Sequence, residues 1–233
     1  MDTAVKKIHK RLSQNINFGY QVIRSRVASR DSSNEIDSLR AFCIFVGYPR
    51  SGSTLVASML GAHPDVVLGH EADVLGHIKW GAGINHIYDI IMKESEKFAT
   101  RGNAWEGYEY EIPNQWQGRN RELLVLGDKE AGMTSVRLSK NPNLINLLRN
   151  QITAPIRIIH VVRNPFDNIT TMFRRGRYPI LRLPLQRCIE DFRRMCTAVE
   201  RLKKEVNDGE FLELSHEELL QNPEAHLRQL CTF

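Results

Sequence analysis

The apolar positions of this chain gather in short runs that end at glycine or at a charged residue. Runs rich in Val, Ile, Leu and Phe are typical of strands buried on both faces of a sheet. They lie at 42–47, 66–68, 123–126, 156–162 and 211–214. Between them, apolar residues recur every three or four positions, which predicts helices, at 54–61, 72–78, 84–98 and 185–206. Alternating strands and helices indicate parallel pairing with right-handed crossovers. We therefore predict a three-layer α/β fold with a central parallel sheet flanked by helices.

The turn after the first predicted strand is the most specific pattern in the chain. Four residues separate Gly47 from Gly52 in a glycine-x4-glycine spacing, and Ser53 and Thr54 follow at the start of a helix. A strand, a glycine-rich turn and a helix N-terminus together present backbone N–H groups to an anion, which favours a phosphate site over a plain turn. Ser53 stands where a triphosphatase carries the lysine that reaches the β- and γ-phosphates. We therefore expect a P-loop-like phosphate site that does not bind a magnesium triphosphate, with Arg50 as its nearby cation.

Charged side chains also follow other predicted strands. Glu71 follows the second strand, where ligands bind in open parallel sheets, although an acid before a helix is also typical of a helix cap. Lys129 follows the third strand, and Arg163 follows the fourth. A triphosphatase would place a magnesium-binding aspartate after such a strand, so a cation there favours a second phosphate over a metal ion.

Residues 100–121 are predicted to be irregular and are long for a loop in a compact domain. They carry Trp105, Tyr108, Tyr110 and Trp116 among Gly, Pro and Asn. Such loops are often substrate-facing elements, but aromatic side chains can equally fill a small satellite core. The sequence leaves both readings open.

The composition bounds the class of protein. The 233 residues, 42% of them hydrophobic, suit one α/β domain. No apolar run is long enough to span a membrane, the start lacks the apolar region of a secretory signal, and the four cysteines show no disulfide spacing. These features predict a cytoplasmic protein with reduced cysteines. The net charge of +5 suits polyanionic ligands, and no nucleic-acid-binding signature accompanies it.

Residues 1–40 form a basic lead-in to the domain at 41–233. The first 30 residues carry seven Lys or Arg against a single Asp. The apolar residues Val5, Ile8, Leu12 and Ile16 have helical spacing. Such a helix could rest on an anionic membrane, but a solvated helix against the domain is the more common arrangement. A loop is expected at 31–34, before the first strand.

Three segments resemble, in order and spacing, the sulfotransferases that use 3′-phosphoadenosine 5′-phosphosulfate (PAPS). Residues 47–55 resemble the family's 5′-phosphosulfate loop. Residues 163–171 resemble its 3′-phosphate motif, in which an arginine and a hydroxyl residue eight positions later bind that phosphate. Residues 214–223 resemble the segment whose aromatic residue touches adenine, with His216 at the aromatic position. Further matches, at 49–55, 62–66 and 69–71, look most like tyrosylprotein sulfotransferases. A bacterial-type relative without a membrane anchor fits best.

The resemblance implies an enzyme that moves the sulfuryl group of PAPS to a hydroxyl acceptor by in-line displacement, without a metal. It implies that Glu71 is the catalytic base and that Arg50 and Lys129 stabilise the transferring group. The residues it implies in donor binding are Arg50, Ser51, Gly52, Ser53, Thr54, Leu55, Arg163, Thr171 and His216. The acceptor stays open among protein tyrosine, carbohydrate and small molecule, as does homodimerisation, and no nucleic-acid partner or transmembrane segment is expected.

Two alternative functions remain from the sequence. A P-loop-type nucleotide or small-molecule kinase is disfavoured by Ser53 and by Arg163. The family's C-terminal glycine-rich loop, which closes over the 3′-phosphate, would follow Phe233. The domain at 41–233 is therefore expected to lack this loop, either as a fragment or with weakened donor binding. That expectation keeps open a catalytically weak module that binds PAPS or its product, adenosine 3′,5′-bisphosphate.

Overall fold

The structure, a computed structural model, describes residues 33–175 and 184–233. The helix predicted from Val5 to Ile16 lies outside these residues. The central sheet contains β1 (Ala41–Gly47), β2 (Val66–His70), β5 (Val125–Lys129), β6 (Ile156–Val162) and β7 (Phe211–Ser215). Its order is β2-β5-β1-β6-β7, and every neighbouring pair is parallel. The predicted parallel α/β fold is confirmed.

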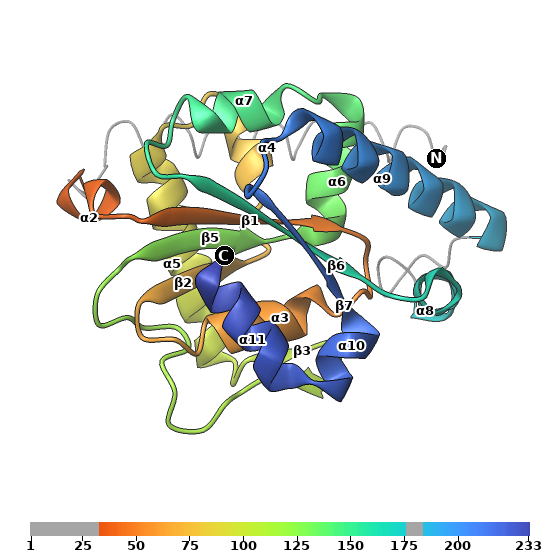
Figure 1. Cartoon of the computed structure of the whole chain (residues 1–233), viewed down its shortest axis with the longest axis horizontal. Helices are drawn as coiled ribbons and strands as arrows, with labels where there is room; N and C mark the ends of the chain where they lie inside the picture. The colour runs from red at the N-terminus through yellow and green to blue at the C-terminus, as the bar shows by residue number, and fades with distance from the viewer. Residues whose placement is uncertain (1–32, 176–183) are drawn as a thin grey trace, which may run out of the picture.

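Helices cover both faces of this sheet, so the described part of the chain has three layers (Figure 1). One face carries α3 (Ser53–Leu60), α10 (His216–Gln221) and α11 (Pro223–Thr232). The other face carries α4 (Val74–Lys79), α6 (Ala131–Lys140), α7 (Leu144–Arg149) and α9 (Leu185–Glu205). Three further helices are α2 (Ser33–Asp37) before β1, α5 (Ile84–Thr100) along β2, and α8 (Pro165–Arg175) after β6.

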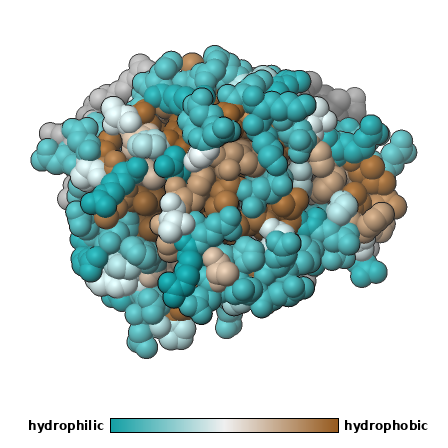
Figure 2. Space-filling model, viewed as in Figure 1, coloured by the Kyte–Doolittle hydropathy of each residue, from teal (hydrophilic) through white to brown (hydrophobic). Residues whose placement is uncertain are grey.

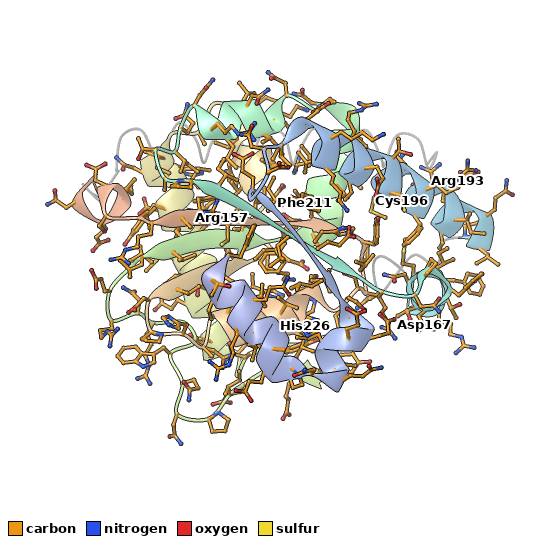
Figure 3. All side chains as sticks on the ribbon, viewed as in Figure 1. Arg157, Asp167, Arg193, Cys196, Phe211 and His226 are labelled. Carbon is orange, nitrogen blue, oxygen red and sulfur yellow. The ribbon has the colours of Figure 1, made fainter. Side chains whose placement is uncertain are left out.

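The alternation of side chains along β1 explains why both faces are covered. Phe42 and Ile44 point into the larger core under α4, α6, α7 and α9, whereas Cys43 and Phe45 point into the core with α3 and α11. Both sets are buried, so the strand reads as a continuous apolar run. On the second face, Arg157 of β6 (labelled in Figure 3) donates a hydrogen bond of 2.5 Å to the carbonyl oxygen of Phe233, which attaches the end of α11 to the sheet.

Several predicted boundaries were wrong. The strand predicted at 123–126 is β5, which begins at Val125 and runs on through Lys129. It begins late because the N–H groups of Leu124 and Val125 both donate to the carbonyl oxygen of Asp65. The helix predicted from Ala72 is α4, which begins at Val74 because Asp73 is its N-cap. Glu71 therefore lies two residues before the cap, and the helix-cap reading of Glu71 is wrong.

The structure also adds elements that the pattern did not predict. The short helix α2 begins within the loop expected at 31–34. Helices α6 and α7 fill the stretch between β5 and β6. The loop at 100–121 contains a two-stranded antiparallel hairpin, β3 (Ala104–Trp105) and β4 (Tyr108–Glu109). Among the described residues, no helix is long and apolar enough to cross a membrane. The four cysteines, all described, form no disulfide.

The surface in Figure 2 is polar over much of its area, with apolar side chains visible across the middle of the view and also at its right-hand side, where α8 and α9 lie in Figure 1. Exposed apolar residues of these helices are Phe166, Phe173, Leu185 and Ile189. Phe166 is 79% exposed, the most exposed large hydrophobic side chain among the described residues.

Candidate functional site at the carboxyl edge of the sheet

Because the five strands are parallel, their carboxyl ends meet at one edge of the sheet. β1 lies at the centre, between β5 and β6. The chain leaves β1 toward one side of the sheet and leaves β6 toward the other, and ligands bind at such a switch point. The predicted site residues follow the strands in turn: Arg50 after β1, Glu71 after β2, Lys129 at the end of β5, Arg163 after β6 and His216 after β7. The structure thus brings them to one edge.

The turn of the predicted phosphate loop, residues 47–52, is tied to α6, to α8 and to Arg163, which follows β6. The N–H of Gly47 donates to Ser135 Oγ of α6 at 2.8 Å, in a buried bond. Asn168 Nδ2 of α8 donates to the carbonyl oxygen of Pro49 at 2.8 Å. Arg163 Nη1 donates to the carbonyl oxygen of Arg50 at 3.2 Å. Two of these bonds occupy carbonyl oxygens of the loop and one occupies its first N–H group, so the loop is held by residues distant in the sequence.

Gly52 is the residue at which the loop turns into α3. Its φ of +94° lies in the left-handed region, and it is the N-cap of the helix without a side-chain cap. The ring of His216 packs directly on it, since a Cβ atom at position 52 would lie 2.3 Å from His216 Nδ1. Ser53, Thr54 and Leu55 follow as the first half-buried residues of α3. Glycine is therefore required here both for its backbone conformation and for its lack of a side chain.

Buried polar atoms without a partner surround the same loop. Within the described part of the chain, no hydrogen bond reaches Ser51 Oγ, Asn168 Oδ1 or His216 Nδ1, although all three atoms are buried. Burial, and to a lesser extent the charge of Arg163, lower the pKa of His216 and keep its ring neutral. Buried polar groups are normally paired, so this cluster points to a ligand with complementary polar groups.

Arg50 has a left-handed backbone, with φ of +72°, and its side chain points to the β3–β4 hairpin. Its guanidinium forms an ion pair with Glu106, with one hydrogen bond of 2.8 Å from Arg50 Nη2 to Glu106 Oε1. Glu106 lies between β3 and β4. In this conformation the hairpin carboxylate holds the arginine.

Glu71 and Lys129 form the second charged pair of the site. Lys129 Nζ donates to Glu71 Oε1 at 3.2 Å, and the Glu71 N–H donates to the Lys129 carbonyl oxygen at 3.1 Å. The lysine side chain is only 4% exposed, whereas the glutamate side chain is 40% exposed and open to solvent. An accessible carboxylate beside a buried ammonium group is suited to accept a proton while a neighbouring negative charge is stabilised.

Aromatic rings cover this pair from the side of α5 and the hairpin. His70 stacks on Phe98 with ring centroids 3.9 Å apart, and the Trp105 ring lies 4.5 Å from His70 and 6.0 Å from Lys129 Nζ. Burial, together with the charges of Lys129 and Arg101, lowers the pKa of His70 to about 2, so this ring is neutral. A small cavity beside Lys129 is lined by His70, Phe98, Ser95, Asn103 and Gln117, among others.

Of the proposed 3′-phosphate residues, Arg163 precedes α8 and Thr171 lies in the second turn of this helix. Arg163 Nη2 donates to Asp167 Oδ2 at 3.4 Å (Asp167 is labelled in Figure 3). Thr171 is half-buried and lies three residues after Asn168, so both occupy the face of α8 that meets the phosphate loop. The structure thus places Thr171 on the same side of α8 as the loop, at the edge where Arg163 also lies.

Sequence reasoning missed Ser135, Asn168, Glu106 and Asp128. Asp128 precedes Lys129 at the end of β5, and this adjacency was its one signal in the sequence. Its carboxylate accepts hydrogen bonds from the N–H groups of Ala72 and Val74, so it is occupied by the protein backbone. Among the described residues, no three acidic, histidine or cysteine side chains gather in a metal-binding arrangement.

Comparison with known proteins agrees with this geometry. The sequence model of the Sulfotransferase family matches residues 43–233. A similar solved structure is the sulfotransferase domain from the Synechococcus PCC 7002 olefin synthase, with a TM-score of 0.53 and 16% identity over 83% of this chain and 72% of that chain.

Two other solved structures are similar but less close in shape. The sulfotransferase domain from the curacin biosynthetic pathway has a TM-score of 0.49 and 14% identity, over 83% of this chain and 73% of that chain. A sulfotransferase from Alicyclobacillus acidocaldarius has a TM-score of 0.48 and 14% identity, over 83% of this chain and 79% of that chain. No match was found among the curated proteins. With its family match spanning the sheet and all the strand-end residues described above, this chain belongs to the sulfotransferase family.

Proposed function

We propose that this sulfotransferase uses PAPS as its donor and moves the sulfuryl group to a hydroxyl acceptor. The observation that carries the proposal is the set of buried, unpartnered polar atoms around the phosphate loop, next to the Glu71–Lys129 pair. Within the described residues these atoms are Ser51 Oγ, Asn168 Oδ1 and His216 Nδ1. The phosphate oxygens of the donor would accept from Ser51 Oγ, and hydroxyl or amino groups of its nucleoside would be the donors that Asn168 Oδ1 lacks.

The residues present fit such a donor. The backbone N–H groups of Ser51 to Thr54 and the hydroxyl groups of this segment would hold the 5′-phosphate, and Leu55 continues the same helix turn. Arg163 and Thr171 would hold the 3′-phosphate, because an arginine and a hydroxyl group provide charge-assisted and neutral hydrogen bonds. His216 would lie between the loop and the nucleoside. When bound, the donor supplies an activated sulfuryl group attached to a phosphate oxygen.

The chain's own residues perform the acid–base and electrostatic work. A carboxylate oxygen of Glu71 accepts the proton of the acceptor hydroxyl while the hydroxyl oxygen bonds to sulfur. Lys129, whose ammonium group is buried beside Glu71, stabilises negative charge on the sulfuryl group and on the oxygen that leaves with the nucleotide. Arg50 adds a second cation once its guanidinium turns from Glu106 toward the loop. No step of this mechanism uses a metal ion.

The test is single-turnover sulfuryl transfer from PAPS to a panel of phenols, sugars and small alcohols. A Gln amide cannot accept a proton, so Glu71→Gln should lower the rate roughly 10²–10⁴-fold. Its affinity for adenosine 3′,5′-bisphosphate should stay within about twofold of wild type. Glu94→Gln, on the outer part of α5, is the matched control and should transfer at the wild-type rate. Transfer by Glu71→Gln at the wild-type rate would remove Glu71 from the mechanism.

A kinase is the rival enzyme, and a nucleotide-binding module without turnover is the rival that is not an enzyme. Thermal-shift curves with adenosine 3′,5′-bisphosphate and with Mg-ATP separate the kinase from the other two, since a ligand raises the melting temperature according to its affinity. Stronger stabilisation by Mg-ATP would favour the kinase. Absence of transfer to every acceptor of the panel, together with tight bisphosphate binding, would favour the module.

The other parts of the proposal concern organisation. We propose that residues 41–233 form the donor-binding domain and that residues 1–40 are a lead-in to it. We also propose a cytoplasmic location, supported by cysteines that form no disulfide, two of which, Cys43 and Cys188, are buried. The acceptor is a hydroxyl group of protein tyrosine, carbohydrate or small molecule, to be decided by the panel.

A further inference from the structure

The segment between β2 and α4 has an unusual backbone. Glu71 has φ of +61° and Asp73 has φ of +56°, so two residues other than glycine adopt the left-handed conformation within three positions. Each such residue costs free energy and persists only where its surroundings hold it. The segment that carries the proposed base is therefore held by contacts from outside it.

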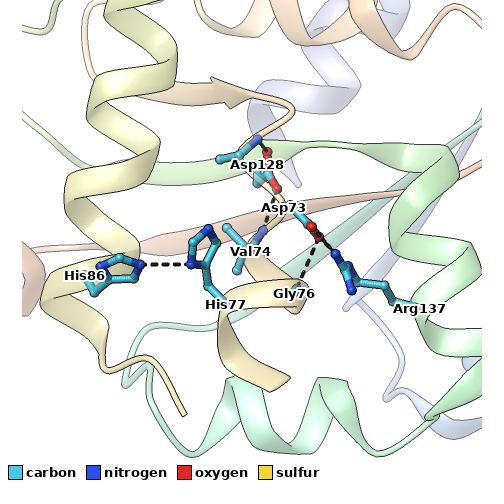
Figure 4. A network of polar contacts seen from close by, with 8 residues as sticks. Asp73, Val74, Gly76, His77, His86, Asp128 and Arg137 are labelled. Carbon is cyan, nitrogen blue, oxygen red and sulfur yellow. Dashed lines mark hydrogen bonds and ion pairs between the residues drawn. The ribbon is translucent and has the colours of Figure 1, made fainter. Parts of the chain in front are cut away.

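Asp128 makes those contacts with the main chain. Its side chain comes from the end of β5, is 2% exposed, and reaches across to the segment after β2 (Figure 4). Oδ1 accepts from the Ala72 N–H at 3.0 Å, and Oδ2 accepts from the Val74 N–H at 3.1 Å. One carboxylate thus accepts from the N–H groups of both neighbours of Asp73, and the first of these neighbours directly follows Glu71.

Neighbouring residues hold the remaining groups of the segment. Asp73 forms an ion pair with Arg137 of α6 and accepts from the Gly76 N–H at 3.2 Å, which caps α4 (Figure 4). Lys129, the residue after Asp128, binds both the main chain and the carboxylate of Glu71. Two consecutive residues of β5 therefore hold this segment. The Asp128 carboxylate accepts from N–H groups that follow Glu71, and Lys129 contacts both the main chain and the side chain of Glu71.

We propose that Asp128 is a positioning residue, which fixes the left-handed turn at Glu71 so that this carboxylate faces the acceptor. The proposal rests on the proposed function of Glu71. Two oxygen acceptors are needed, because two N–H groups converge on one side chain. Asn at position 128 would keep one acceptor oxygen and turn an amide N–H donor toward the other backbone N–H group. The turn would then lose one of its two hydrogen bonds. A displacement of about 1 Å at a reacting group lowers turnover by roughly 10²-fold.

The experiment is a double-mutant cycle of Asp128→Asn and Glu71→Gln, measured as single-turnover sulfuryl transfer from PAPS at pH 8. Burial raises the pKa of Asp128 to about 7, against the opposing effect of its two backbone hydrogen bonds, so pH 8 keeps the wild-type carboxylate ionised. Asp191→Asn is the matched control. Asp191 is also a buried carboxylate, 3% exposed, and it forms an ion pair with Arg194 within α9.

We expect Asp128→Asn to lower the transfer rate about 10–100-fold and to leave the affinity for adenosine 3′,5′-bisphosphate within about twofold. In the Glu71→Gln background the same substitution should change the rate less than about twofold, because a residue that acts through Glu71 has nothing left to position. Asp191→Asn should have the same small effect in both backgrounds.

An equal loss from Asp128→Asn in both backgrounds would overturn the positioning role while leaving Glu71 as the base. A normal rate for Glu71→Gln would instead overturn the proposed function. If Asp128→Asn does not fold, hydrogen exchange of the Ala72 and Val74 amides in the wild-type chain replaces the cycle. Strong protection of both amides supports the two bonds, and exchange at the rate of an unstructured peptide overturns them.

Discussion

At the scale of single residues, the charge of the phosphate loop depends on Arg50 and on the carboxylate that holds it. Arg50 is the cation within the loop, and Glu106 of the hairpin forms an ion pair with it. An anion that binds at the loop must compete with Glu106 for the guanidinium. The pair is partly exposed, with side-chain exposures of 18% and 37%, so the energy at stake is about 1 kcal/mol or less.

Glu106→Gln should therefore raise the affinity for adenosine 3′,5′-bisphosphate about two- to fivefold, since it removes the competing charge. Titration calorimetry at low and high salt measures this, and the gain should shrink as salt screens the pair. Glu109→Gln, an exposed carboxylate on β4 of the same hairpin, is the control and should leave the affinity unchanged. A weaker affinity in Glu106→Gln would mean that Glu106 supports the loop rather than competing with the ligand.

At the scale of elements, the phosphate loop is held between α6 and α8. Ser135 accepts the N–H of Gly47 and is fully buried, and Asn168 donates to Pro49 and is also fully buried. Helix α6 also approaches closely at Gly132, where a Cβ atom would lie 2.9 Å from Pro49 Cγ. The loop is thus shaped by helices that follow other strands, as well as by its own glycines.

Ser135→Ala should lower the free energy of unfolding by about 1–3 kcal/mol, because it leaves the buried N–H of Gly47 without an acceptor. Urea unfolding measures the change, provided that the dependence of the unfolding free energy on urea concentration is the same in wild type and variant. Ser139→Ala, one turn later on the same helix, is the control. Ser139 is only half-buried and bonds within its own helix, so its loss should cost about 0.5 kcal/mol or less. Equal losses of unfolding free energy in the two variants would contradict a stabilising role for the hydrogen bond between Gly47 and Ser135.

The fold and part of the site could be predicted from the sequence, because local apolar runs mark the strands. The contacts between residues distant in the sequence could not. The runs that became β1 and β6 end where predicted, at Gly47 and before Arg163, since an apolar run stops where burial on both faces stops. The same rule ended the next two strands too early, at Leu68 and Leu126, because β2 continues through His70 and β5 through Lys129. The bonds from Ser135 and Asn168 join residues 88 and 119 positions apart, and no local pattern predicts such contacts. The Arg50–Glu106 pair was missed for the same reason.

At the scale of the whole molecule, buried histidines set the response to acid. Burial lowers the pKa of His70, His77, His86, His160 and His216. Below the ordinary value of 6.5 the unfolded chain binds protons at these residues that the folded chain does not bind, so stability falls as the pH falls. Asp128 acts in the opposite direction, because its folded pKa of about 7 exceeds its ordinary value of 3.8.

His70→Gln isolates one of these contributions. At pH 7 it should lower stability by about 1 kcal/mol, since the stacking on Phe98 is lost. The folded pKa of His70, about 2, lies below the unfolded value of 6.5, so the wild-type penalty grows as the pH falls from 7 to 5. The variant should therefore lose roughly 1–2 kcal/mol less than wild type over this range. Urea unfolding at several pH values measures the free energy of unfolding of both proteins. If this free energy changes with pH equally in wild type and variant, the lowered pKa of His70 is contradicted.

The central position of β1 also has a consequence for how the protein folds. β1 is made early in the chain, yet both its partners, β5 and β6, begin only at Val125 and Ile156. Folding slows as contacts become more distant along the chain, because loop closure must come before the pairing that rewards it. Until both partners dock, Phe42 to Val46 form an unpaired apolar strand that is prone to aggregate. The ability to bind a nucleotide should therefore appear late in refolding, after most helices have formed, and an early intermediate should gain no protection from the ligand.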